Sequence, residues 1–174
     1  MNIRTLPILL LAITAALDAP NTQAATTGSL KFVGQINAGT CNLAAGDVNR
    51  SITLPAVKVS DFDSTLIAGA FDFEISAECE SDLRNVIFQF TGTPDPISTW
   101  RFANTGTAEG IALWLYSRIG GVEETIRANG TNNTRTIAVS SSRAILPLGA
   151  AYFKTKAVAQ GTLASTATVS ITYN

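Results

Sequence analysis

The stretch Ala70–Cys79, which reads AFDFEISAEC, is the strongest structural signal in this sequence. From Phe71 to Cys79 an apolar residue occupies every second position, and each position between carries a polar or charged side chain. Successive side chains of a β-strand point to opposite faces, so this period of two predicts a strand with one buried face. Cys79 belongs to that buried face.

Similar alternation recurs on both sides of this stretch, whereas few stretches show the 3.6-residue period of a helix. It predicts further strands at residues 29–37, 51–59, 85–91, 111–118, 135–139, 144–155 and 162–173. Clusters of Gly, Pro and Asn between them are typical of turns, and one short helical turn is expected at residues 61–67. Many short strands joined by turns favour a single all-β domain, either a sandwich or a barrel.

The composition argues against several classes of function. The chain has 174 residues, 12 Lys and Arg against 13 Asp and Glu, and no His. Nucleic-acid binding would need a basic excess, and the usual general acid or base is absent. Glu123 and Glu124 are adjacent and point to opposite faces of a strand, so they form no acid–base pair. We expect no enzymatic activity, no cofactor, no metal site and no nucleic-acid partner.

The first 24 residues are predicted to be a secretory signal peptide. Arg4 supplies a positive charge, Leu6–Leu17 is almost entirely apolar, and small residues precede a cleavage site after Ala24. An apolar run of this length is shorter than the roughly 20 residues that cross a bilayer, so we expect no membrane insertion. The mature chain would begin at Ala25.

Export decides how the cysteines are interpreted. Cys41 and Cys79 are the only two in the chain. In an oxidising compartment an isolated pair is most simply one structural disulfide. Closing a loop of about 39 residues would stabilise the fold by about 4 kcal/mol in the chain-entropy account.

The two ends of the mature chain carry the most specific pattern. Residues 30–36, LKFVGQI, alternate and are followed closely by Cys41. The last alternating segment ends with Tyr173 as the penultimate residue, and Gly161 is the fourteenth residue from the C-terminus. In this order, and after a signal peptide, these features resemble the chaperone–usher (type 1-like) fimbrial pilin family.

The resemblance implies an incomplete immunoglobulin-like β-sandwich that is completed by a donor strand from another protein. In that family a periplasmic pilus chaperone fills the open groove first. The N-terminal extension of a neighbouring pilin subunit replaces it at an outer-membrane usher. The chain would divide into a signal peptide (1–24), a donor-strand extension (25–37) and a pilin domain (38–174). The expected donor residues are Leu30, Phe32, Gly34 and Ile36, and the expected chaperone or groove residues are Gly161, Val169, Ile171 and Tyr173.

The expected function is that of a structural subunit of a cell-surface fimbria, exported through the periplasm and supporting adhesion. Shaft and minor subunits both fit this sequence. The alternative is a secreted monomeric β-sandwich protein that binds glycans. A pilin without its partner should aggregate or stay bound to a chaperone, whereas the monomeric binder should be soluble by itself.

Overall fold

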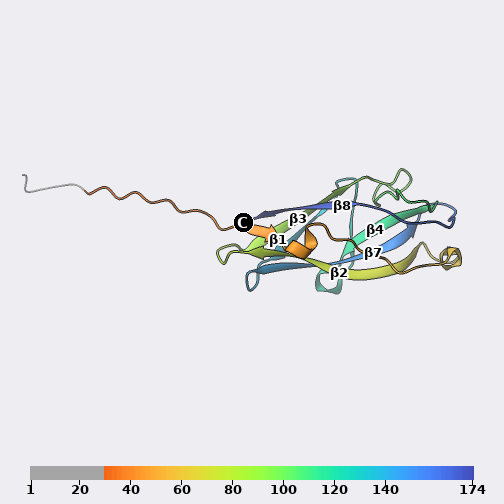
Figure 1. Ribbon diagram of the computed structural model, residues 1–174, viewed down its shortest axis with the longest axis horizontal. Helices are drawn as coiled ribbons and strands as arrows, with labels where there is room; N and C mark the ends of the chain where they lie inside the picture. Colours follow the sequence, from red (N-terminus) through yellow and green to blue (C-terminus); the bar gives the residue numbers. More distant parts are fainter. Residues whose placement is uncertain (1–29) are drawn as a thin grey trace, which may run out of the picture. The chain divides into compact units, whose positions relative to one another are not determined.

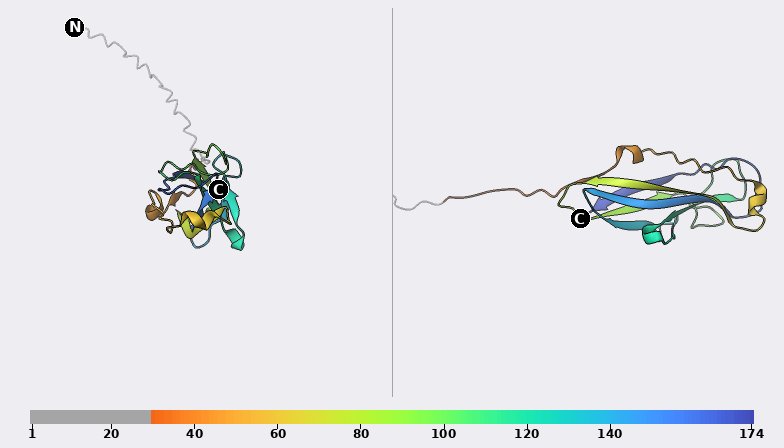
Figure 2. Two further views of the ribbon diagram at one scale, coloured as in Figure 1. Left: turned by 90° about the vertical axis from the view of Figure 1, so that its right-hand side faces the viewer. Right: turned by 90° about the horizontal axis from the view of Figure 1, so that it is seen from below.

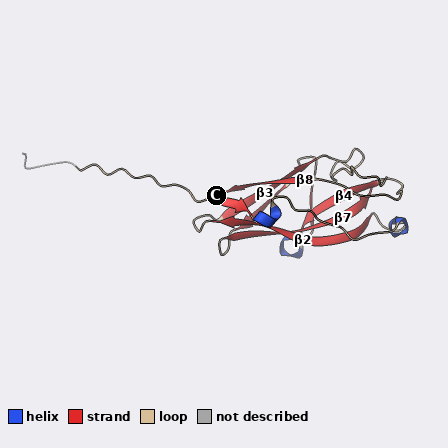
Figure 3. Cartoon of the chain, viewed as in Figure 1, coloured by secondary structure: helices blue, strands red, loops and turns tan. Residues whose placement is uncertain are grey.

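The computed structural model describes residues 30–174, and residues 37–174 form a unit built from eight strands (Figures 1 and 3). The strands are β1 (Cys41–Leu43), β2 (Ile67–Cys79), β3 (Asn85–Gly92), β4 (Ile111–Ser117), β5 (Glu124–Ile126), β6 (Thr134–Ala138), β7 (Arg143–Lys154) and β8 (Ala167–Tyr173). Three 3₁₀ turns accompany them: η1 (Ala45–Asp47), η2 (Val59–Phe62) and η3 (Ile119–Gly121). The all-β prediction is confirmed.

The strands form two antiparallel sheets that pack face to face (Figure 2). One sheet has the order β1-β2-β7-β4-β5 and the other the order β6-β3-β8. In the smaller sheet β8 pairs only with β3, with Phe88 opposite Ile171. The other edge of β8 is therefore an edge of the sheet.

The core lies between the sheets and follows the alternation of the strands. Leu146 and Leu148 of β7 project inward against Val86 and Phe88 of β3, and all four are almost fully buried. Burying a large apolar side chain contributes roughly 1.5–3 kcal/mol, so these two central strands hold the sheets together. Phe102 is fully buried as well and joins the loop before β4 to the same core.

The alternating stretch Ala70–Cys79 forms most of β2. Ile75, Ala77 and Cys79 are buried as predicted, but Phe71 is 42% exposed, so the prediction that it is buried is wrong. A register shift between Ala68 and Phe71 interrupts the pairing of β2 with β7 just before this residue. Gly69 supplies the positive φ of 61° at the shift, a conformation that glycine adopts without steric cost.

Two predicted strands are absent. Residues 30–37 and 51–58 have strand-like alternation but no strand structure. Conversely, β1 and β5 were not predicted, because three residues are too few to display a period of two. The last strand begins at Ala167 rather than at residue 162.

Candidate functional site

An open groove of about 610 Å³ lies beside the last strand. One wall is made by residues 163–167 together with Val169, and the other by residues 51–54. The floor is apolar and is contributed by both sheets, from Phe73, Ile75, Phe90, Leu113, Leu115, Leu148, Ala150 and Tyr152. The interior of the sandwich is thus open to solvent along this line.

The groove is bordered on one side by the free edge of β8 and on the other by a segment without backbone partners. β8 is hydrogen-bonded to β3 on one side only. Within the described part of the chain, residues 51–57 make no backbone–backbone hydrogen bond at all. Backbone N–H and C=O groups need partners when water is excluded, so a strand inserted between these walls would satisfy the facing edge of β8.

A hydrogen bond and an ion pair hold the chain just before residues 51–54. Asp47 accepts a 2.9 Å hydrogen bond from the backbone N–H of Ser76 and pairs with Arg50 at 3.0 Å. The guanidinium of Arg50 also lies 5.8 Å from the ring centre of Phe73 on the groove floor. The chain that leads into residues 51–54 is therefore fixed to β2, although no strand pairing fixes residues 51–54 themselves.

The structure brings only one of the expected groove residues to this groove. Val169 lines it, while Ile171 and Tyr173 lie further along β8 and are not among the lining residues. Ile171 pairs with Phe88 of β3, and Tyr173 pairs with Val86. The side chains of Phe88 and Val86 are buried between the sheets. The assignment of Ile171 and Tyr173 to the chaperone or acceptor surface stays a prediction.

Gly161 also lies outside the groove. It borders a separate hollow of about 270 Å³ with Phe62 and Tyr152. A Cβ added at Gly161 would lie 2.3 Å from the backbone nitrogen of Ala108, so glycine is required there for close backbone approach. β8 starts six residues after Gly161, and the role expected of Gly161 in chaperone recognition stays a prediction.

The N-terminal segment, taken by itself, is a row of exposed apolar side chains. Leu30 is 84% exposed, Phe32 88% and Ile36 100%. Gly34 has no atom within 4 Å of the position a Cβ would take. The predicted signal peptide, residues 1–24, lies outside the described residues.

Residues 30–174 match the fimbrial protein family. The chain belongs to this family. The fimbrial subunit ElfA of Escherichia coli K12 is 27% identical over 107 residues, which are 59% of this chain and 60% of that protein. The chain therefore aligns with about three fifths of the length of this curated relative.

Solved pilus subunits share the fold of this pilin. The P pilus rod subunit PapA superposes with a TM-score of 0.63 at 18% identity, over 77% of this chain and 99% of that one. A solved structure of a chaperone–usher pilus gives a TM-score of 0.64 at 16% identity, over 88% of this chain and 99% of that one. The pilin thus has the incomplete immunoglobulin-like sandwich of chaperone–usher subunits. As a member of the fimbrial protein family, it is a structural protein rather than an enzyme.

The disulfide of the pilin joins its first two strands. Cys41 of β1 and Cys79 of β2 lie directly opposite each other and are bonded. Both half-cystines are buried. The bond therefore anchors the start of the domain, immediately after the N-terminal segment, to the longest strand of the larger sheet.

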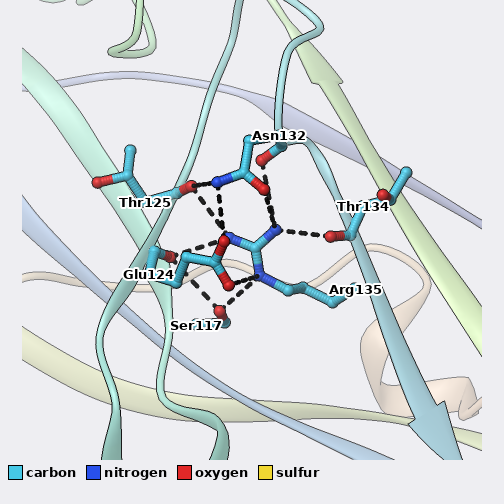
Figure 4. Close-up of polar contacts among 6 residues, drawn as sticks. All are labelled: Ser117, Glu124, Thr125, Asn132, Thr134 and Arg135. Atoms are coloured by element: carbon cyan, nitrogen blue, oxygen red, sulfur yellow. Dashed lines mark hydrogen bonds and ion pairs between the residues drawn. The ribbon is translucent and has the colours of Figure 1, made fainter.

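A buried arginine organises another part of the sandwich interior (Figure 4). Arg135 of β6 is 5% exposed, and its Nε donates to Ser117 Oγ at 2.7 Å. Its Nη2 donates to the carbonyl oxygens of Glu124 and Thr125, and its Nη1 donates to that of Thr134. Burial lowers the pKa of Arg135, and the nearby Glu124 carboxylate opposes that shift. The residue ties β6 to β4 and β5, and sequence patterns gave no sign of it.

The described residues contain neither a candidate metal site nor a candidate membrane-spanning helix. Residues 30–174 contain no group of three or more Cys, Asp or Glu side chains placed to hold a metal ion. The same residues include no helix with the length and apolar character needed to cross a membrane.

Proposed function

We propose that this pilin polymerises by donor-strand exchange. Its groove would be filled first by a strand of a periplasmic pilus chaperone and then, at an outer-membrane usher, by residues 30–36 of the next subunit. The observation that carries the proposal is the open apolar groove, bordered on one side by the free edge of β8 and on the other by residues 51–54, which have no strand partner.

The dimensions of the groove support this proposal. A cavity left by removing one large core side chain is about 150 Å³, so 610 Å³ corresponds to about four such spaces. The segment 30–36 offers three large apolar side chains on one face of an extended strand. The groove wall from residue 163 to Val169 spans seven residues, as does the proposed donor.

Exposure of the proposed donor supports the same conclusion. Leu30, Phe32 and Ile36 are almost fully exposed, and burying them in a neighbour would contribute about 5–9 kcal/mol. A whole domain is stable by only about 5–15 kcal/mol. A subunit with a vacant groove would accordingly be marginal and prone to edge-to-edge aggregation, which explains the need for a chaperone before assembly.

The proposed route begins with export to the periplasm and ends in a cell-surface fimbria. The decisive experiment is expression of the full chain with and without a cognate chaperone, followed by purification from the periplasm. We expect a stoichiometric complex with the chaperone and little soluble subunit without it. A soluble monomer that unfolds cooperatively without any partner would contradict the proposal and favour the monomeric glycan-binding alternative.

A matched pair of variants tests the donor face. Phe32→Ser places a polar group on the face that would enter the groove, whereas Val33→Ser changes the opposite face of the same segment. We expect Phe32→Ser to abolish fibres in electron micrographs and Val33→Ser to retain them. Fibres of normal length from Phe32→Ser would refute the assignment of the donor strand.

A further inference from the structure

A cluster of two arginines and three aromatic rings lies on the outer face of the larger sheet. The guanidinium carbon of Arg101 is 4.1 Å from the ring centre of Phe153 and 5.5 Å from that of Trp114. The guanidinium carbon of Arg127 is 3.7 Å from the ring centre of Trp100. We refer to these five residues as the arginine–aromatic cluster.

The cluster is built by β4, β7, the end of β5 and the loop before β4. Trp114 of β4 points away from the groove, because its neighbours Leu113 and Leu115 line the groove floor. The Nε1 of Trp114 donates to Thr125 Oγ1 of β5 at 3.0 Å, which fixes the indole. The carbonyl oxygen of Trp100 accepts a hydrogen bond from the N–H of Ala128, which holds the loop beside the end of β5.

The two arginines have no anionic partner within residues 30–174. Neither guanidinium takes part in an ion pair or a side-chain hydrogen bond there. Arg101 Nε and Nη1 and Arg127 Nε are buried and unpartnered. Burial, and secondly the charge of Arg127, lowers the pKa of Arg101. Arg135 shows the contrast, since that buried guanidinium is satisfied on all sides.

Unpaired buried donors are costly, so an acceptor that hydrogen-bonds to these guanidinium groups would remove part of that cost. Guanidinium groups stacked on rings keep their planar N–H edges free for a carboxylate or sulfate. Trp100 is 48% exposed, so its indole adds an apolar surface beside the two charges. Ligand sites combine such aromatic surface with a few convergent polar groups.

We propose that the arginine–aromatic cluster binds an acidic saccharide, with its carboxylate or sulfate held by Arg101 and Arg127 and its sugar ring packed on Trp100. None of the five cluster residues lines the donor-strand groove. The proposed site is therefore distinct from the donor-strand groove.

The chain offers a built-in reporter for this site. It contains two tryptophans, Trp100 and Trp114, and both belong to the cluster. Intrinsic fluorescence of the full mature chain, in whichever form it is purified, can be titrated with sialyllactose, a sulfated heparin disaccharide, neutral lactose and sodium sulfate. The first two probes distinguish a carboxylate from a sulfate as the bound group.

We expect a saturable fluorescence change with at least one acidic sugar and none with lactose. Arg127→Gln should weaken that binding by about tenfold or more, the size of one lost charged hydrogen bond. Arg127→Lys should bind more tightly than Arg127→Gln because it keeps the charge. Arg84→Gln, which removes one exposed positive charge outside the cluster, is the matched control and should bind like the unmodified chain.

Several results would overturn the proposal. One is the absence of a saturable fluorescence change with either acidic sugar. Another is an equal fluorescence change with lactose, and a third is unaltered binding of the acidic sugar by Arg127→Gln. An equal loss of affinity for the acidic sugar in Arg127→Gln and Arg127→Lys would show that the charge of Arg127 does not contribute to binding. If the sulfate ion binds as tightly as the sulfated disaccharide, the sugar ring does not pack on Trp100. Circular dichroism of each variant separates lost binding from lost folding.

Discussion

Supplying the missing strand within one chain should convert this pilin into a stable monomer. The perturbation is a second copy of residues 25–37, attached after Asn174 through a short turn and running back antiparallel to β8. Val169, at the groove, lies five residues before Asn174, which is about 17 Å of strand. Residues 25–29 of the copy span the same length, so that the copy's Leu30 reaches the groove beside Val169.

The magnitude follows from the exposure of the donor residues. Leu30, Phe32 and Ile36 are 84%, 88% and 100% exposed, and their burial would contribute about 5–9 kcal/mol. Ordering the copy opposes this gain by about 1–2 kcal/mol for each residue fixed. Because two variants of the copy pay nearly the same ordering cost, this cost cancels when their stabilities are compared. Phe32→Ser in the copy should lose about 2–3 kcal/mol relative to Val33→Ser, or roughly 5–10 °C in melting temperature.

The assay is thermal unfolding followed by circular dichroism, combined with size-exclusion chromatography. The chain with the intact copy should elute as a monomer and unfold cooperatively, as should the Val33→Ser version with nearly the same midpoint. Equal midpoints for the Phe32→Ser and Val33→Ser copies would show that the alternating face does not enter the groove. Aggregation of all three chains would refute the proposed donor.

Three further predictions concern the donor, the disulfide and the sandwich interior. Gly34→Val should block polymerisation by placing a side chain on the donor face, while a chaperone complex still forms; fibres of normal length in electron micrographs would contradict this. Replacing both Cys41 and Cys79 by serine in the self-complemented chain should lower its free energy of unfolding in guanidinium by about 4 kcal/mol. Arg135→Ala should lower it by about 3 kcal/mol, since the hydroxyl and carbonyl acceptors around the guanidinium lose their donor in the interior; a loss no larger than that of the exposed Arg84→Ala would argue against this.

The central strands could be predicted from the sequence because each one buries a single face. β3 and β7 alternate in the sequence as they do in the structure, with Val86, Phe88, Leu146 and Leu148 all inside. β1 and β5 could not be predicted in this way. They are short edge strands whose pairing depends on residues distant in the chain, such as Cys79 for β1 and Leu115 for β5.

The candidate sites were harder to predict than the strands. Residues 51–54 form a groove wall because Asp47 and Arg50 fix the preceding chain to β2, a contact between residues 29 apart in sequence. Arg101 and Arg127 share a face because the loop before β4 folds over the sheet. No local pattern marks either arrangement. Gly161 packs against the backbone of Ala108, a contact that its place in the C-terminal pattern did not predict.

The two strands that were predicted but do not form have one physical explanation. Residues 30–36 and 51–57 both alternate as strands do, yet an alternating sequence becomes a strand only when a neighbour supplies hydrogen bonds and a surface to cover. Residues 51–54 border the groove, where a neighbouring strand would lie. Residues 30–36 have the length and side chains to be that neighbour in another subunit. We infer that both segments gain strand partners in the same event, so hydrogen exchange at residues 51–57 should slow when the groove is filled. Unchanged exchange there, in a chain whose groove is occupied, would show that the two segments are unrelated.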